Sequence, residues 1–313
     1  MRTLVVTAAD EAFMPLLRGL VESLQQWEPR PFSGVACLDL GLSATSRQWI
    51  ASIATQVVAP GWDLPVDEAL RQEHPELRAL TVRPFLPRYF PGYDVYLWID
   101  SDAWVQERFA LDWLIAAAAT GRLAAAPQVH HAYLQSKENF DWRMHRMRTC
   151  FGPEASRRLS WNAYFNAGVF ALRADAPHWA RWAKWFGLGL EASGGKLCCD
   201  QTALNQAIWV EQLPLAPMPA LCNWLCHLAP PRYDVARGKF CEPAAPWHPI
   251  GILHLSADSK DMQLEVRGEG RTLGLRFPRG APAARCGGLH SRSSRKMNSD
   301  ASCAVPDGED QVS

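Results

Sequence analysis

An apolar run at residues 93–99 ends in Asp100-Ser101-Asp102 and closes a series in which short apolar strands alternate with amphipathic helices. Such alternation is typical of a mainly parallel sheet flanked by helices. Sheets of this kind bind ligands at the carboxyl ends of their strands. Because side chains alternate along an extended segment, Asp100 and Asp102 point the same way and Ser101 points back. The pattern therefore predicts an α/β fold with two carboxylates at its ligand-binding edge.

Two carboxylates that face the same way repel each other unless a cation lies between them. Mn²⁺ and Mg²⁺ prefer oxygen ligands and are often shared with substrate phosphates. We therefore interpret Asp100 and Asp102 as metal ligands. A D-x-D triplet also occurs in ordinary Asp-rich turns, so this interpretation depends on its position directly after a buried strand.

Hydrophobic periodicity predicts the other elements. Strands are expected at 4–7, 33–38, 55–59, 123–126, 165–172 and 250–255, and helices at 12–26, 46–52, 75–87, in the Ala-rich stretch from 111, at 178–190 and at 200–210. No element is assigned to the polar, basic stretch 136–158, and 213–249 is expected to be a Pro- and Trp-rich loop. Apolar periodicity stops near residue 279. We therefore expect a single domain at 1–278 and a low-complexity, disordered tail at 279–313.

The composition is that of an ordinary globular protein: of 313 residues, 48% are hydrophobic and 20% are charged, and the formal net charge is +0. A neutral chain has no overall attraction to nucleic acid, so no nucleic-acid partner is expected. The N-terminal residues lack the features of a signal peptide, and no apolar run approaches the ~18 residues of a membrane span. Nine scattered Cys favour reduced thiols. We expect a cytoplasmic protein without a transmembrane segment, and peripheral contact with the inner face of a membrane stays open.

Two local patterns suggest alternatives that we disfavour. Cys222, Cys226 and His227 suggest zinc, but the chain has no second C-x-x-C pair, and Cys198-Cys199 is too cramped to supply both missing ligands. The Trp-rich helix expected at 178–190 carries Arg and Lys and suggests a membrane surface. Packing on the domain with the charges outward is the favoured interpretation of that helix.

Five further segments accompany the D-x-D triplet. They are Thr7-Ala8-Ala9-Asp10-Glu11-Ala12-Phe13, Arg83, Asn166-Ala167-Gly168, Asp200-Gln201-x-x-Leu204-Asn205, and His254 followed by Lys260. In this order and near this spacing they resemble glycosyltransferase family 8, whose members are retaining transferases with the GT-A fold. Bacterial lipopolysaccharide galactosyl- and glucosyltransferases are the nearest comparison. The resemblance covers residues 3–260 in separate blocks.

The resemblance implies a nucleotide subsite after the first strand. There Asp10 would contact the uracil edge, Phe13 would stack on the uracil ring, and Ala8 would line the same subsite. The resemblance also places Ser101 among the residues that would contact the nucleotide-sugar donor. A carboxylate can accept the base N–H, and a ring face can cover the base. From the residues alone, Asp10 can equally cap the following helix and Phe13 can face the core.

The resemblance also implies contacts to the donor diphosphate and sugar. Arg83 would face both, because an Arg fork suits phosphate oxygens; Arg88 is the rival. Asn166 and Ala167 would contact the donor sugar, with Asn166 bonding its hydroxyls. Gly168 would let backbone approach closely.

For the catalytic centre, the resemblance implies that Asp200 binds sugar hydroxyls and that Gln201 lies beside the anomeric carbon. His254 would be the third metal ligand, since neutral imidazole and two carboxylates can complete a Mn²⁺ site. Lys260 would reach the diphosphate. The sequence departs from the family pattern where Thr202 replaces the second acid, Ala257 replaces Gly, and Asp261-Met262 replaces Pro-Trp.

The implied activity is metal-dependent transfer of a hexose from a UDP-sugar to an acceptor hydroxyl, with retention, in cell-surface glycan or lipopolysaccharide synthesis. No side chain is a convincing general base, so the leaving phosphate would take the acceptor proton. Gln201 would then support the cationic sugar or orient the acceptor, and Asp200 is the alternative nucleophile. The acceptor can be a carbohydrate, a lipid-linked sugar or a protein, with 139–158 and 213–247 as its walls.

Two other functions stay open. The changes at Ala257 and Asp261 suggest a transferase-like domain that binds a nucleotide sugar or glycan without turnover. A sugar-1-phosphate nucleotidyltransferase shares a nucleotide-binding α/β core. It would carry a Gly-rich loop after the first strand, and residues 7–13 contain no Gly.

Overall fold

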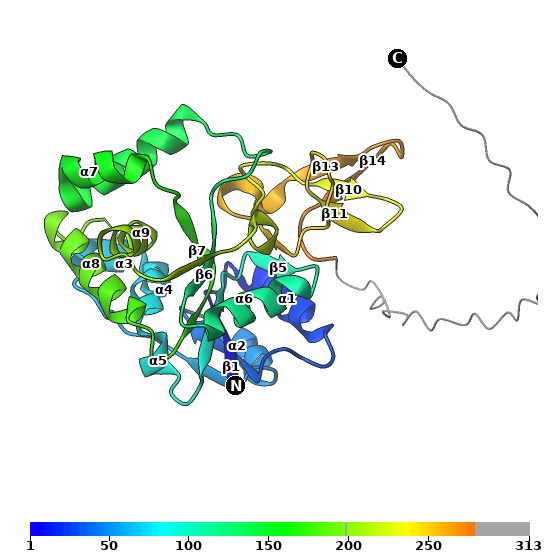
Figure 1. Cartoon of the computed structure of the whole chain (residues 1–313). Helices are drawn as coiled ribbons and strands as arrows, with labels where there is room; N and C mark the ends of the chain where they lie inside the picture. Colours follow the sequence, from blue (N-terminus) through cyan, green and yellow to red (C-terminus); the bar gives the residue numbers. More distant parts are fainter. Residues whose placement is uncertain (198, 279–313) are drawn as a thin grey trace, which may run out of the picture. The chain divides into compact units, whose positions relative to one another are not determined.

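A seven-stranded sheet forms the centre of the computed structural model, which describes residues 1–197 and 199–278 (Figure 1). The strand order is β3-β2-β1-β4-β7-β6-β8. The strands are β1 Thr3–Ala9, β2 Gly34–Asp39, β3 Gln56–Val58, β4 Val95–Ile99, β6 Leu123–Pro127, β7 Phe165–Arg173 and β8 Leu215–Pro217. The tail expected at 279–313 lies outside the described residues.

Within this sheet β7 alone of the described strands runs antiparallel to its neighbours, β4 and β6. Its amino end therefore lies at the same edge of the sheet as the carboxyl ends of β1 and β4. Ile99 is paired with Val169, and the Asp100 N–H donates to the Gly168 carbonyl at 2.8 Å. The D-x-D triplet and the Asn166-Ala167-Gly168 segment are thus brought together by strand register.

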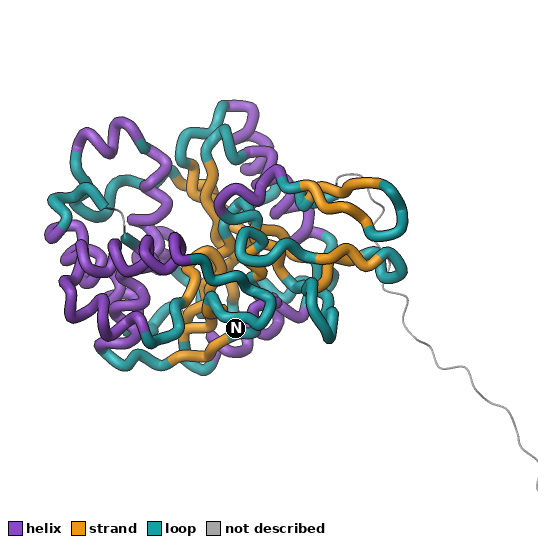
Figure 2. The backbone as a smooth tube through the Cα atoms, turned by 90° about the horizontal axis from the view of Figure 1, so that it is seen from above, coloured by secondary structure: helices purple, strands orange, loops and turns teal. Residues whose placement is uncertain are grey.

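Helices cover both faces of the sheet (Figures 1 and 2). The helices are α1 Met14–Gln25, α2 Ala44–Ala51, α3 Glu68–Glu73, α4 Arg78–Val82, α5 Leu86–Tyr89, α6 Phe109–Ala119, α7 Lys137–Ser160, α8 His178–Ala192 and α9 Asp200–Val210. Leu4 and Val6 of β1 pack in the same core cluster as side chains of α8 and α9. Val5 between them packs in the cluster that contains side chains of α1 and α6. Because side chains alternate between the two faces of a strand, both faces of β1 are buried.

A smaller three-stranded sheet, β5-β12-β9, joins the end of the D-x-D segment to the C-terminal part of the domain. Its strands are β5 Ala103–Val105, β12 Ile252–His254 and β9 Trp224–Leu225. In the antiparallel β5–β12 pair, Ala103 lies opposite His254. Two hairpins extend this part of the chain (Figure 1): β10 Arg232–Asp234 with β11 Lys239–Cys241, and β13 Gln263–Val266 with β14 Arg271–Gly274.

The expected α/β fold, a mainly parallel sheet flanked by helices, is confirmed, with three local corrections. The helix expected at 75–87 is broken into short pieces, α4 and α5 with 3₁₀ turns at Pro75–Leu77 and Arg83–Phe85, because Pro84 and Pro87 supply no backbone N–H. The stretch 136–158, to which no element was assigned, contains α7. The supposed loop 213–249 carries the short strands β8 to β11.

Helix α7 was not predicted because most of its residues are polar and only a few of its side chains are buried. It begins after Ser136, whose Oγ accepts the Asn139 N–H at 3.1 Å. Gly152, with φ 82° and ψ 172°, interrupts it one residue before Pro153, so a kink separates its two halves.

None of the helices in the part of the chain that the structure describes has both the length and the hydropathy of a bilayer-spanning segment. The thiols of the described Cys residues are free. Cys222, Cys226 and His227 do not form one of the described clusters of potential metal ligands.

Candidate active site

Asp100, Asp102 and His254 form a cluster at the edge where β4 of the large sheet meets β12 of the small sheet. The His254 Nε2 atom lies 3.3 Å from an Asp102 carboxylate oxygen and 3.8 Å from an Asp100 oxygen. One ligand atom from each of the three residues lies within 4.8 Å of the others. Two carboxylate oxygens and an imidazole nitrogen suit a divalent metal ion with oxygen and nitrogen ligands, so these residues fit Mn²⁺ or Mg²⁺.

A chain of hydrogen bonds fixes which nitrogen of His254 carries the proton. The Gly168 N–H can only donate, and it donates to Asn166 at 2.8 Å, so the atom at that position is the Asn166 Oδ1. The same oxygen accepts from Nδ2 of Asn223 at 2.9 Å. The Asn223 Oδ1 therefore faces His254 Nδ1, at 2.9 Å, and that nitrogen must be the donor. In the neutral imidazole the lone pair is then on Nε2, which faces the two carboxylates, as a metal ligand requires.

Asn223 was missed in the sequence. It lies directly before β9, is buried, and stands in a stretch without regular periodicity. A single Asn far from the known motifs gave no signal that could have identified it.

Arg83 connects the D-x-D segment to α9. Its two terminal nitrogens donate to carboxylates of Asp100 and Asp200, and its guanidinium lies 4.9 Å from the centre of the Trp98 ring. Burial disfavours the charge of Arg83, but Asp100 and Asp200 outweigh burial and raise its pKa. The rival Arg88 instead pairs with Asp63.

The two carboxylates of the triplet have different surroundings. Burial raises the pKa of Asp100, and the neighbouring Asp102 adds to that shift, although Arg83 and the Trp98 indole N–H (2.7 Å) oppose it. Burial also opposes the charge of Asp102, but the protonated form of His254 and then Lys260 hold its pKa well below its ordinary value. The Lys260 ammonium lies 2.9 Å from Asp102.

Lys260 is held in a turn that contains an unusual backbone conformation. Its Nζ donates to the carbonyls of Leu255 and Ala257 at 3.2 and 3.1 Å. Ala257 has φ 54°, in the left-handed region that favours glycine. Ala257 therefore occupies a backbone position that suits Gly better than an L-residue.

Gln201 is oriented by the amino end of β7. Its Oε1 accepts the Ala167 N–H and an Asn166 Nδ2–H, both at 3.0 Å. Because the backbone N–H needs an acceptor, this end of the amide is the oxygen, and the NH₂ end is left to donate to other groups.

Asn205 and Thr202 attach α9 to the same strand. The Asn205 amide accepts the Phe165 N–H at 2.7 Å and donates to the Phe165 carbonyl at 2.9 Å. Thr202, which replaces the second acid of the resembled motif, lies 3.0 Å from the Tyr164 hydroxyl. The Asp-Gln end of α9 is therefore placed against β7 by side chains of the helix itself.

The residues expected to hold the nucleotide lie at the carboxyl end of β1. Ala8 is buried in the strand. Asp10 accepts the Phe13 N–H at 2.9 Å and so closes the turn that precedes α1, whose own N-cap residue is Phe13. The Lys260 ammonium lies 5.6 Å from the Phe13 ring centre, which brings this segment next to Asp102. Ser101 is buried and lines a cavity of about 360 Å³ with Asp102.

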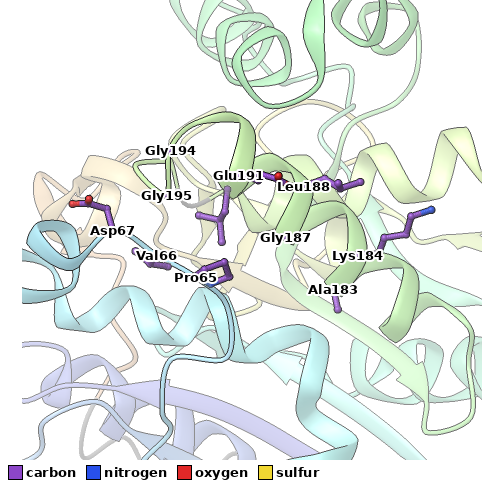
Figure 3. Close-up of a pocket in the computed structure, with 11 residues that line it drawn as sticks. Pro65, Val66, Asp67, Ala183, Lys184, Gly187, Leu188, Glu191, Gly194 and Gly195 are labelled. Atoms are coloured by element: carbon purple, nitrogen blue, oxygen red, sulfur yellow. The ribbon is translucent and has the colours of Figure 1, made fainter.

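A cavity of about 440 Å³ opens beside Asn166 and Gln201. Its other wall comes from α7 and the segment before it, with His227 and Ala257 completing the lining. A roomier cavity of about 620 Å³ lies elsewhere, between residues 65–67 and the end of α8 (Figure 3). Its lining is largely small or apolar, and its Asp67 carboxylate accepts the Ala69 and Leu70 N–H groups. The 440 Å³ cavity is therefore the better candidate for a substrate site.

No protein-family model matches the sequence, and no curated protein matches it. The chain does match solved structures. One is the galactosyltransferase LgtC in complex with donor and acceptor sugar analogues: it is 16% identical, the match covers 82% of this chain and 88% of that chain, and the TM-score is 0.52. The chain has the GT-A glycosyltransferase fold.

Two other GT-A structures are more distant. The bifunctional glycosyltransferase WbbM is 13% identical with a TM-score of 0.48, and the match covers 70% of this chain but only 39% of the WbbM chain. Mouse xyloside xylosyltransferase 1 is 12% identical with a TM-score of 0.45, and the match covers 81% of this chain and 96% of that chain.

Within this GT-A fold, most of the expected site residues meet in one place. A continuous chain of pairwise contacts links Arg83, Asp100, Asp102, Asn166, Ala167, Gly168, Asp200, Gln201, His254 and Lys260. Ser101 lies between two of these residues in the chain, Phe13 lies near Lys260, and Ala8 and Asp10 belong to the segment that leads to Phe13. Asn223 joins it as a residue that the sequence did not reveal.

Proposed function

We propose that the protein is a metal-dependent retaining glycosyltransferase that moves a hexose from a UDP-sugar to an acceptor hydroxyl. One observation carries the proposal: a His254 lone pair, fixed by Asn223, is directed at Asp100 and Asp102 at the ligand edge of a GT-A fold. The LgtC structure that shares this fold contains donor and acceptor sugar analogues.

Asp100, Asp102 and His254 would hold Mn²⁺ or Mg²⁺. A bound ion of this kind acts as a Lewis acid and neutralises the charge that grows on a leaving diphosphate. Lys260 lies 2.9 Å from Asp102 and supplies a second positive charge on the same side. Asp10 and Phe13 would hold the base, since the bond to the Phe13 N–H uses one Asp10 oxygen and leaves the other for a base N–H.

The donor sugar would lie between the Arg83–Asp200 pair and Asn166. Arg83 already bridges Asp100 and Asp200, so it ties the diphosphate side of the site to the sugar side. Asp200 and Asn166 offer an acceptor and a donor to sugar hydroxyls. Arg83 would therefore have two roles: it would contact the donor, and it positions the carboxylates of Asp100 and Asp200.

Retention follows most simply from reaction on one face of the sugar. The Gln201 oxygen already accepts two hydrogen bonds, and one oxygen of Asp200 is paired with the Arg83 guanidinium, which makes both groups weak nucleophiles toward the anomeric carbon. Asp200, whose other oxygen is not used by Arg83, is the alternative nucleophile. The bond between the anomeric carbon and the UDP oxygen breaks, and a bond to the acceptor oxygen forms on the same face. The acceptor proton passes to the leaving phosphate. The Gln201 NH₂ would orient the acceptor or the departing oxygen.

The acceptor is a carbohydrate, a lipid-linked sugar or a protein, and synthesis of a cell-surface glycan or lipopolysaccharide is the setting that we propose. Stretches 139–158 and 213–247 were expected to wall the acceptor site. Residues of α7 do line the 440 Å³ cavity beside Gln201.

The test is UDP release from a panel of UDP-sugars, with Mn²⁺ and after chelation by EDTA. We expect metal-dependent release that Asp102→Ala reduces to background, because Asp102 contacts both His254 and Lys260. Asp112→Ala, which removes a partly exposed carboxylate paired with Arg108 on α6, is the matched control and should keep full activity. Undiminished activity of Asp102→Ala would overturn the metal assignment.

The same assay separates the alternative functions. Metal-dependent binding of a UDP-sugar without release under any acceptor would indicate a binding module. Release of pyrophosphate from UTP and a sugar 1-phosphate would indicate nucleotidyl transfer.

A further inference from the structure

Helix α7 presents one polar and aromatic face to the 440 Å³ cavity. Asn139, Trp142 and Arg143 all line it, and their spacing places them on neighbouring positions of one helix face. The cavity reaches the candidate centre through Asn166 and Gln201. Its lining includes neither the metal-binding cluster nor the Arg83–Asp200 pair. A ligand in this cavity therefore lies beside Gln201 without contacting the metal-binding cluster or the Arg83–Asp200 pair, which is the position expected of an acceptor.

Arg143 is the positive charge of this wall, and it lacks a negative partner in the described chain. Its guanidinium lies 5.5 Å from the centre of the Tyr164 ring and 5.9 Å from that of Phe140. Its hydrogen bond to the Gln135 side chain is long, at 3.4 Å, and its buried Nε has no partner. Glu138 lines the same cavity but is exposed and forms no ion pair with Arg143 in residues 1–197 and 199–278.

The two arginines of the site differ in how their charge is balanced. Arg83 is bound to two carboxylates, which raise its pKa in spite of burial. Burial lowers the pKa of Arg143, because no carboxylate offsets the loss of water around its charge. A partly buried guanidinium without a counter-charge is costly for the protein alone and favourable once an anion arrives.

The remaining lining suits a sugar ring. Trp142 is 51% exposed, the Arg146 guanidinium lies 4.8 Å from its ring centre, and the exposed part of the ring is an aromatic surface on which an apolar face of a sugar ring can pack. Gln128, Gln135 and Asn139 offer amide donors and acceptors for hydroxyl groups. The cavity thus combines a flat apolar surface, amides for hydroxyls, and one unpaired cation.

We propose that this cavity binds the acceptor and that Arg143 binds an anionic group on the acceptor, a carboxylate or a phosphate. A guanidinium fork forms paired hydrogen bonds with either group. The proposal rests on the proposed function, since it assigns the substrate class of the same site. The acceptor is then an acidic sugar, such as a uronic acid or a sugar phosphate.

The experiment measures direct binding of three probes by titration calorimetry: methyl glucoside, methyl glucuronide and glucose 6-phosphate, with Mn²⁺ and UDP present. The unmodified protein should bind one of the anionic probes about tenfold or more tightly than the neutral probe, as charge-assisted hydrogen bonds allow. The anionic probe that binds identifies carboxylate or phosphate as the recognised group. Arg143→Gln should remove the preference, and Arg143→Lys should keep part of it.

The matched control is Arg157→Gln, which removes an exposed arginine of the same helix that pairs with Glu154. It should leave the preference unchanged, and thermal unfolding checks that each variant is folded. Equal binding of all three probes, or a preference that survives Arg143→Gln, overturns the inference. A preference for UDP-glucuronate over UDP-glucose that depends on Arg143 overturns it too, because Arg143 would then recognise the donor.

Failure of the proposed function has a different signature. If no UDP-sugar gives metal-dependent UDP release while the anionic probe still binds through Arg143, the proposed transferase activity is wrong and the anion site stands. If UDP release is metal-dependent and the probes bind without preference, the transferase stands and the anion site is wrong.

Discussion

Asn223 accepts a hydrogen bond from Nδ1 of His254 at 2.9 Å, and this contact directs the free Nε2 lone pair of the imidazole at Asp100 and Asp102. Asn223 is itself oriented by Asn166, so the tautomer and the orientation of the proposed metal ligand are set from β7. Partners of this kind, one contact removed from the metal, commonly govern affinity.

Replacing Asn223 with Leu should weaken Mn²⁺ binding by about 10- to 100-fold, the range typical of such partners. Asn223→Asp should lose less Mn²⁺ affinity, because a carboxylate still accepts the His254 Nδ1–H. Titration of Mn²⁺ into each variant measures the affinity. Affinities that equal that of the unmodified protein would contradict the role assigned to Asn223.

Gly168→Ala should disable the site while leaving the fold intact. A Cβ atom at Gly168 would lie 2.3 Å from His254 Cε1 and 2.6 Å from Asp100 Oδ2, so both groups must move. Displacement of about an ångström can cost about 100-fold in rate, so we expect a loss of that size in UDP release. The control is Gly187→Ala in α8, where a Cβ would meet nothing within 4 Å and should be harmless. An active Gly168→Ala protein would show that the close packing at this position is unimportant.

Ala257→Gly should stabilise the protein. Ala257 has φ 54°, and an L-residue in the left-handed region costs about 1–2 kcal/mol relative to the ordinary conformation. The unfolded chain gains freedom with Gly, which reduces the benefit, so we expect a gain of about 1 kcal/mol or less. Chemical denaturation measures the free energy of unfolding. Ala117→Gly inside α6 is the contrasting variant, and its free energy of unfolding should fall by about 1 kcal/mol. A fall of similar size in Ala257→Gly would show that Ala257 is not strained.

Local patterns predicted every strand of the large sheet except β8, because most of these strands are buried and apolar. Composition and period alone identified both β4 and β7. The register between β4 and β7 also explains why Asp100 and Gly168 meet. Asp100 directly follows β4, and Gly168 lies near the amino end of β7, at the same edge of the sheet.

The rest of the site depends on contacts that are distant in sequence. Asn223 and His254 are 31 positions apart and meet through β9 and β12, which have only two and three residues. Strands so short carry no periodicity that can be read. Arg83 stands in a broken helical region, and its two carboxylate partners follow from tertiary packing rather than from spacing. Helix α7 was missed because its buried residues are few and its exposed face includes Phe140 and Trp142.

Strand β7 is paired on both sides, with β4 and with β6, so Asn166 and Gly168 keep their places as long as the sheet exists. The opposite wall of the cavity comes largely from one surface helix, which carries Trp142 and Arg143. Substitutions on that helix need not disturb the sheet, whereas substitutions in β7 must. On the proposed function, exchange of this one outer segment would change the acceptor that the protein takes and leave the proposed reaction centre unchanged.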